Sequence, residues 1–422
     1  MRGTFLLGVI LLLMYWGFRK PIIFVLAYVW ASIFTPQHVA YSIITSIPIS
    51  LIFGLAAFVA FLKLQKVPYV KWRSQSVLTS ALAIWMTLTL LWAVVPEHAF
   101  VKWDWAIKSI AFTVIIPHFI RDRQDFEAFL WTVVAGGMAH CIPFGAKVIL
   151  SGGGYGMPLG LVAGNSGYGE GSTLAMFSVS LIPMCIYLYI YQTLIPHLRL
   201  AKLMLGIFIV FLLLTSIGTY ARTGVVCLVA LGACLIYYGK RRILSVALVI
   251  ILAGVAYPFI EIDWLERMSS INDDSEASAM GRVAVWMWVI EYIASHPWGG
   301  SFDMYRINVF SMNLPDGTFL QITSKAFHSI YFEMLGEGGV PGLLLYMFLI
   351  LTTLLAFVRH AKILRLTGEL WLSDAARYLL ITTLIFLVGG AFIGIAFQSY
   401  FYYLAALAAA VVNLTAKHAP NG

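Results

Sequence analysis

Residues 326–342 read AFHSIYFEMLGEGGVPG, and the other segments of the chain are best interpreted in relation to this stretch. One histidine, His328, opens a long apolar run whose spacing predicts a helix. Below the imidazole the helix face carries small residues such as Gly339, which would let a neighbouring helix approach closely. Glu333 and Glu337 lie one turn apart, at the expected membrane rim. Histidines also occur at helix ends as plain interface residues, so its role depends on the groups around it.

The composition defines the class of protein. The chain of 422 residues is 61% hydrophobic and only 11% charged, whereas a soluble domain carries about 25% charged residues. The net charge of +8 comes from short basic clusters between apolar segments, which indicates membrane topology and not a nucleic-acid partner. All four cysteines lie inside apolar runs without metal-like spacing, so we expect free core residues. The sequence therefore predicts an all-α polytopic membrane protein.

Apolar segments recur along most of the chain. A spanning helix needs about 20 such residues, so the pattern predicts about 12 transmembrane helices, or 13 if the first two short segments each cross. The first segment resembles a signal-peptide core, but no small-residue cleavage site follows it, and we expect it to be retained. The segments are 4–18, 21–34, 40–62, 76–95, 101–120, 128–150, 171–195, 201–218, 222–239, 243–260, 328–358, 376–394 and 398–414.

Lys and Arg alternate between the loops that join these segments. They cluster at 63–73, 121–123, 199–202, 240–242 and 359–365. The positive-inside rule places these basic loops and the C-terminus in the cytoplasm, and His328 on the other side. The predicted organisation is N-terminal transmembrane helices (1–260), a large extracytoplasmic loop (261–327), and C-terminal transmembrane helices with a cytoplasmic tail (328–422).

The long loop has its own plan. An acidic, Ser-rich opening at 272–276 is followed by a helix-like run at 281–295 that ends before His296 and Pro297. The run is too short to span a membrane and carries Trp286 and Trp288, so we expect an interfacial helix with these rings as anchors. His296 is explained as a cap of the last carbonyls.

Two arginines lie at positions that the positive-inside rule does not explain. Arg222 begins a span at the extracytoplasmic side, although orientation-setting basic residues gather on the other side. A guanidinium near hydrocarbon costs roughly a few kcal/mol unless it is paired or faces a polar cavity; snorkelling to lipid phosphate is the alternative. Arg282 begins the interfacial run, where helix-end amides add to an anion site. Two arginines can clamp phosphate oxygens, and with His328 they indicate phosphate leaving-group chemistry.

Three blocks carry a resemblance to a known family. In order they are TYARTG at 219–224, the Arg282 run leading into HPWGG at 296–300, and the block from HS at 328 to LGEGG ending at 339. They resemble the bacterial O-antigen ligase superfamily, which includes lipopolysaccharide ligases, O-antigen polymerases and O-oligosaccharyltransferases. The histidine block is especially similar to ligases associated with exosortase systems. Ala221 departs from the pattern, because many members have Ser before the arginine.

The resemblance implies a cofactor-free, metal-independent glycosyltransferase of the GT-C type in the bacterial inner membrane, with its active site facing the periplasm. The donor would be a glycan on undecaprenyl pyrophosphate, and the acceptor the sugar core of lipid A. Arg222 and Arg282 would hold the donor pyrophosphate and stabilise the leaving charge. His328, with an ordinary pKa of about 6.5, would be the general base for the acceptor hydroxyl. A single displacement would invert the anomeric centre.

Several alternatives stay open. Polymerisation of the same donor and transfer to protein would use the same donor site. A transporter of lipid-linked glycans is less favoured, because no matching half-repeat is seen and the notable charges gather at one face. Lys108 is a further candidate for the donor phosphate, although an i,i+4 pair with Asp104 explains it. Asp273 and Asp274 are carboxylates of a kind that binds divalent ions, but in a Ser-rich loop such residues are usually solvated.

Overall fold

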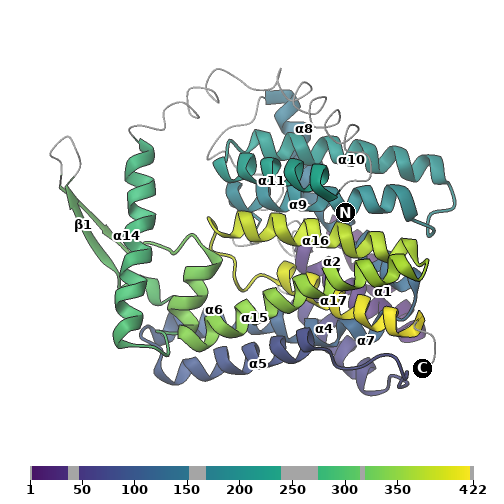
Figure 1. The fold of residues 1–422 in the computed structure, drawn as a ribbon, viewed down its shortest axis with the longest axis horizontal. Helices are drawn as coiled ribbons and strands as arrows, with labels where there is room; N and C mark the ends of the chain where they lie inside the picture. The colour runs from purple at the N-terminus through teal and green to yellow at the C-terminus, as the bar shows by residue number, and fades with distance from the viewer. Residues whose placement is uncertain (1, 37–46, 152–167, 239–273, 314–318, 419–422) are drawn as a thin grey trace.

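The computed structural model describes residues 2–36, 47–151, 168–238, 274–313 and 319–418. Figure 1 shows these parts as a bundle of helices with a hairpin of strands at one end. The predicted segment 243–260 and Asp273 lie outside the described residues. Each of the other predicted apolar segments contains a helix or a series of short helices.

The elements before the long loop are α1 (Arg2–Arg19), α2 (Ile22–Phe34), α4 (Ile49–Leu62), α5 (Ser74–Leu88), η2 (Thr89–Trp92), α6 (Pro96–Ala111), η3 (Phe112–Ile115), α7 (Ile116–Phe119), α8 (Arg123–Ser151), α9 (Gly171–Tyr191), α10 (Leu198–Gly218) and α11 (Arg222–Tyr238). Those that follow are α14 (Asp274–Ser295), η5 (Met304–Ile307), β1 (Val309–Asn313), β2 (Phe319–Thr323), α15 (Ile330–Leu366), α16 (Leu370–Gly390) and α17 (Ser399–His418).

The chain is a multi-pass membrane protein. Among the described residues, 7 helices are long and apolar enough to cross a membrane: Ser74–Trp92, Arg123–Ser151, Gly171–Tyr191, Leu198–Gly218, Ile330–Leu366, Leu370–Gly390 and Ser399–Lys417. Shorter apolar helices are Gly3–Arg19, Ile22–Phe34, Ile49–Leu62 and Arg222–Tyr238. A total of about 12 or 13 crossings, based on the length that a span needs, stays a prediction, as does the GT-C-like architecture.

The centre of the bundle is formed by α9, α16 and α17. In α17, 89% of the spanning window is buried inside the protein, against 33% in Ser74–Trp92. A helix that is apolar all round and buried all round belongs to the core, whereas α5 turns an apolar face outward to lipid. The four cysteines are free, as predicted.

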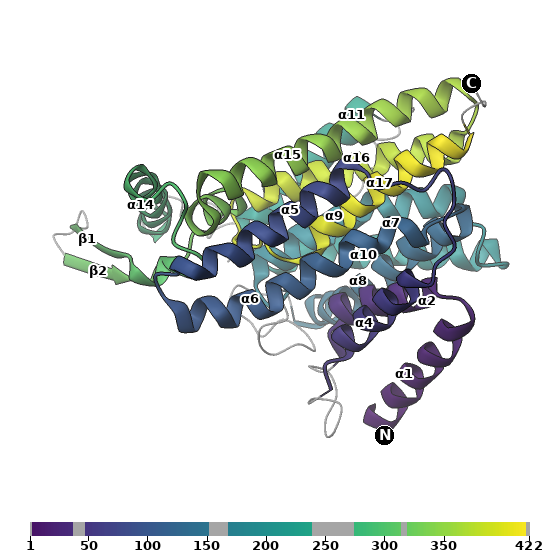
Figure 2. The same ribbon diagram turned by 90° about the horizontal axis from the view of Figure 1, so that it is seen from below.

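The long loop is not purely helical. Helix α14 starts at Asp274, ahead of the predicted run at 281–295. Strands β1 and β2 pair in antiparallel fashion, with Val309 opposite Thr323. The structure agrees with the predicted all-α membrane class and adds this one hairpin, which was not predicted. Figures 1 and 2 show α14 and the hairpin at one end of the bundle, beside the start of α15.

Helix α15 is broken at Gly339. Its φ of 67° and ψ of −168° suit only glycine and interrupt the helical hydrogen bonds. Residues 297–301 satisfy the backbone groups that the break leaves unpaired, which a membrane protein requires. The N–H of Gly300 donates to the carbonyl of Gly336 at 2.9 Å, and the N–H of Ser301 donates to the carbonyl of Glu337 at 3.0 Å. In the other direction, the N–H of Val340 donates to the carbonyl of Pro297 at 2.9 Å.

Gly299 and Gly339 cross at very close range. A Cβ on Gly339 would lie 2.3 Å from the carbonyl carbon of Trp298, and one on Gly299 would lie 2.4 Å from the nitrogen of Gly339. The prediction that a neighbouring helix approaches Gly339 is therefore wrong, because an irregular segment does so. The HPWGG and LGEGG blocks form one structural unit.

Candidate functional site

His328 lies just before α15 and not inside it. Its φ of 48° is in the left-handed region, which costs a non-glycine residue roughly 1–3 kcal/mol. Contacts on both sides hold this backbone. The indole N–H of Trp286 donates to the carbonyl of Phe327 at 2.9 Å, and the same ring stacks on Phe332 with centroids 4.9 Å apart. Strain that is maintained by such contacts is typical of a functional site.

The tryptophans of α14 do more than anchor a helix in the interface. Besides Trp286, Trp288 packs against a small core around Val285 and Val289 that joins α14 to the start of α15. The interpretation of these rings as plain anchors is therefore wrong. His296 behaves as predicted: its Nδ1 lies 3.3 Å from the carbonyl of Tyr292 at the helix end.

Two cations lie near the imidazole. Burial, then the charges of Arg282 and Lys325, lower the pKa of His328 to about 4. The ammonium of Lys325 lies 3.6 Å from where a Cβ of Gly281 would stand, so it is directly beside the helix that carries Arg282. Arg282 and Lys325 thus both lie near enough to His328 for their charges to act on its ring. The roles of Arg282 and His328 stay predictions. Lys325 was not predicted; its place on the Lys-poor side was the available signal.

Asn308 fixes the backbone that carries Lys325. Its side-chain oxygen accepts from the N–H of Lys325 at 2.8 Å, and its amide donates to the carbonyl of the same residue at 2.8 Å. Asn308 is completely buried. A buried amide that is satisfied in this way holds the segment before His328 in one conformation.

Arg222 is not in this group. It is exposed at the first position of α11, and among the described residues no hydrogen bond or ion pair holds its guanidinium. Helix α11 packs on α16, where Cys227 Sγ lies 3.9 Å from the carbonyl of Ile385. Helix α16 in turn meets the start of α15, since a Cβ on Gly390 would lie 2.7 Å from Ile330. Arg222 therefore lies at the same end of the bundle as His328, but on another helix.

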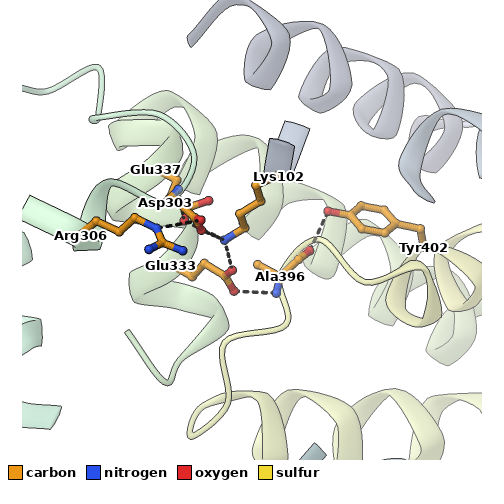
Figure 3. A network of polar contacts seen from close by, with 7 residues as sticks. All are labelled: Lys102, Asp303, Arg306, Glu333, Glu337, Ala396 and Tyr402. Atoms are coloured by element: carbon orange, nitrogen blue, oxygen red, sulfur yellow. Dashed lines mark hydrogen bonds and ion pairs between the residues drawn. The ribbon is translucent and has the colours of Figure 1, made fainter. Parts of the chain in front are cut away.

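A second charged group is buried close by, and Figure 3 shows it. We call Lys102, Asp303, Glu333 and Glu337 the Lys102 cluster. The ammonium of Lys102, on α6, lies 2.7 Å from Glu333, 2.8 Å from Glu337 and 3.6 Å from Asp303. Glu333 also accepts from the N–H of Ala396 at 2.8 Å. The cluster therefore links α6, the turn at Asp303, α15 and the segment before α17.

The Lys102 cluster was not predicted. Glu333 and Glu337 were placed at the membrane rim, but Lys102 sits at the start of the apolar run 101–120, where an ionisable residue is itself a signal. The residue singled out there was Lys108, which forms the predicted i,i+4 pair with Asp104 at 2.5 Å. Both side chains are partly exposed, Lys108 at 39% and Asp104 at 50%. A role for Lys108 at the donor phosphate stays a prediction.

A cavity of about 650 Å³ opens beside both charged groups, within the range of about 300–1,000 Å³ typical of ligand sites. Lys102, Asp303 and Glu333 line it, and so does Phe327, which directly precedes His328. Hydroxyl and aromatic side chains complete the wall, among them Ser32, Thr35, Ser50, Trp105, Tyr168 and Ser399. This lining suits a ligand that carries many hydroxyl groups.

In the described part of the chain, no three His, Cys, Asp or Glu side chains are arranged to hold a metal ion. The carboxylates of the Lys102 cluster surround an ammonium instead. Metal independence stays a prediction.

The fold and the site together define a multi-pass membrane protein with a cationic histidine site at one end of its helices. Residues 207–347 match the family described as O-Antigen ligase, and this range includes Arg222, Arg282 and His328. This match supports membership of the O-antigen ligase superfamily, which the three blocks predict. Residues 1–193 match a family of unknown function, DUF5935. No curated protein matches the chain.

Proposed function

We propose that this protein is an O-antigen ligase that transfers a glycan from undecaprenyl pyrophosphate to a hydroxyl of the lipid A core, at the periplasmic face of the bacterial inner membrane. The family match supports the broader class of ligase or polymerase. The observation that carries the finer proposal is the grouping of Arg282 and Lys325 around His328.

The two cations suit a pyrophosphate. Among the described residues neither Arg282 nor Lys325 has a carboxylate partner, and the charge of a bound pyrophosphate would compensate both. Arg222, exposed at the same end of the bundle, is the third donor contact that we propose. An arginine can bind two phosphate oxygens at once and stabilise the charge that develops as pyrophosphate leaves.

His328 is the proposed general base. With a pKa of about 4, its imidazole is neutral at neutral pH and free to accept a proton, but it is a weak base. A bound pyrophosphate would offset the charges of Arg282 and Lys325 and so raise this pKa. The donor would thereby activate the base. His328 then takes the proton of the acceptor hydroxyl as its oxygen bonds to the anomeric carbon, the bond to pyrophosphate breaks, and the centre inverts.

A transporter is less well supported. Broken helices are a feature of transporters, where they face a substrate cavity. In α15 the break at Gly339 is instead filled by the segment 297–301. Polymerisation of the donor and transfer to protein are the alternatives within the enzyme class, and the polar cavity suits each of them.

The test supplies purified protein with a lipid-linked donor that carries a labelled glycan. Parallel reactions contain lipid A core, donor alone, or an acceptor protein, with His328→Ala protein as the control. Ligation predicts that label moves to lipid A core and that undecaprenyl pyrophosphate is released in equal amount. Longer lipid-linked glycans in the reaction with donor alone would identify a polymerase and overturn ligation.

A further inference from the structure

A second cavity, of about 420 Å³, lies near the other end of α15. Three of its lining residues are basic: Arg73, directly before α5, and the neighbours Arg359 and His360 on α15. None of its lining residues is acidic. The cavity therefore gathers positive charge that its own wall does not neutralise.

The guanidinium of Arg73 is held in place by uncharged partners. Its Nε donates to Oδ1 of Asn413 at 2.6 Å, and its Nη2 donates to the carbonyl of Tyr69 at 3.3 Å. Asn413, on α17, is completely buried and also accepts from the N–H of Lys71 at 3.2 Å. These bonds orient the guanidinium fork, and neither of these partners carries a charge that would compensate it.

The other two basic groups line the same cavity as Arg73. Both Arg73 and Arg359 lie near enough to His360 for their charges to act on its ring. The Nδ1 atom of His360 is buried and has no hydrogen-bond partner among the described residues. The positive charges of Arg73 and Arg359 repel each other, so an anion that binds between these two side chains reduces an unfavourable interaction.

The rim of the cavity is apolar and open to the surroundings. Trp72 is 53% exposed and Leu355 is 56% exposed, and both line the cavity. A soluble anion gains nothing from such a rim, whereas the acyl chains of a lipid pack on it. Basic pockets between transmembrane helices are a known form of acidic headgroup site.

We propose that this cavity binds the phosphate group of an anionic phospholipid. Arg73 and Arg359 contact the phosphate, and Trp72 and Leu355 contact the acyl chains. Because Gln75 donates to the carbonyl of Thr352 at 2.8 Å beside the cavity, a lipid bound there also strengthens the contact between α5 and α15. The site lies at the opposite end of α15 from His328, so it is independent of the proposed glycosyl transfer.

The experiment uses the full-length protein, purified and delipidated in an uncharged detergent. Binding of phosphatidylglycerol and phosphatidylcholine is measured by native mass spectrometry and by the shift in thermal unfolding. Arg359→Gln is the main variant, because Arg359 is exposed and can be replaced without disturbing the fold. Arg365→Gln is the matched control, since it removes one charge from the same helix end outside the cavity.

We expect wild-type and Arg365→Gln proteins to bind phosphatidylglycerol in preference to phosphatidylcholine. Loss of one charge-assisted contact should weaken this binding about tenfold in Arg359→Gln. Equal losses in both variants, or no preference between the two lipids, would overturn the proposal. A further arm adds inorganic phosphate. If it raises the unfolding temperature as much as phosphatidylglycerol does, the site takes a soluble phosphate and the assignment to lipid is wrong.

Discussion

The two charged groups beside the start of α15 are built in opposite ways. In the Lys102 cluster an ammonium lies within 2.8 Å of two buried carboxylates. Around His328, the cations Arg282 and Lys325 stand beside an imidazole, and no carboxylate in the described part of the chain compensates them. Opposite charges that bind one another hold helices together, whereas like charges left without a partner are suited to bind an anion. The Lys102 cluster is therefore suited to a structural role, and the group around His328 is suited to a chemical one.

The largest effect is expected at Arg282 and Arg222, the two arginines that we propose bind the donor. Arg282→Ala should nearly abolish transfer, because donor binding and stabilisation of the leaving group are lost together. Arg282→Lys should restore little activity, because a lysine ammonium cannot make the bidentate contact of an arginine. Arg222→Ala should behave in the same way. Membrane insertion and thermal unfolding should not change, and wild-type turnover in Arg222→Ala would refute its assignment.

The next effect concerns His328. Replacement by Ala should reduce turnover by about 10²–10⁴, the usual contribution of a general base, while donor binding changes little. Single-turnover rates and donor titration measure the two quantities separately. His296→Ala is the control, because this histidine is exposed and only caps α14. If His328→Ala kept its turnover but failed to bind donor, the base would have to be sought at Glu333 or Glu337.

Substitutions in the Lys102 cluster should lower the stability of the folded protein. Lys102→Met leaves buried carboxylates without their cation, which costs about 3–5 kcal/mol. Lys108→Met breaks only the exposed pair with Asp104, which is worth about 0–1 kcal/mol. Thermal unfolding in detergent, with wild-type protein as reference, should rank the two variants in this order. Equal unfolding temperatures would mean that the cluster is not structural.

A smaller effect is a shift of the pH profile. His328 acts as a base only when neutral, so kcat/KM, which reports the free enzyme, should fall as the pH drops through about 4. The sequence alone predicts this fall near the ordinary pKa of histidine, about 6.5. Lys325→Gln removes a nearby positive charge, so it should raise the pKa of His328 and move the fall to higher pH. Lys108→Gln should leave the profile in place; an unchanged profile in Lys325→Gln would contradict the grouping.

The smallest expected effect is none at all. Transfer should proceed without ATP, because the site is predicted to face away from cytoplasmic nucleotide. It should also proceed in EDTA, because the buried carboxylates already bind an ammonium. Loss of activity in EDTA, with recovery in Mg²⁺ or Mn²⁺, would show that the reaction needs a divalent cation and would contradict this prediction.

Much of the fold was predictable because hydrophobic length is a strong signal. The segment predicted at 201–218 is α10 (Leu198–Gly218), and that at 171–195 is α9 (Gly171–Tyr191). The hairpin at 309–323 was not predicted, since short strands depend on their pairing more than on composition. The break at Gly339 was not predicted either, because a glycine in an apolar run also fits a helix face.

The site was predictable only where a residue conflicts with its surroundings. Arg222 and Arg282 stand out because Lys and Arg are depleted on the far side of a membrane, and His328 stands out because it titrates near neutral pH. Lys102 and Glu333 meet across 231 positions of sequence, and no local pattern links them. Lys325 lies in a polar loop, where a single charge usually means only solvation.

The crossing of Gly299 and Gly339 also couples folding of the long loop to insertion of α15 during biogenesis. Pro341 has no N–H to offer the carbonyl of Glu337, so that carbonyl depends on Ser301 for its bond. The first part of α15 therefore cannot settle in the bilayer as a finished span by itself. Residues 297–301 leave the ribosome before α15 and are available when this helix inserts. Folding of the loop and insertion of the helix after it are thus one step.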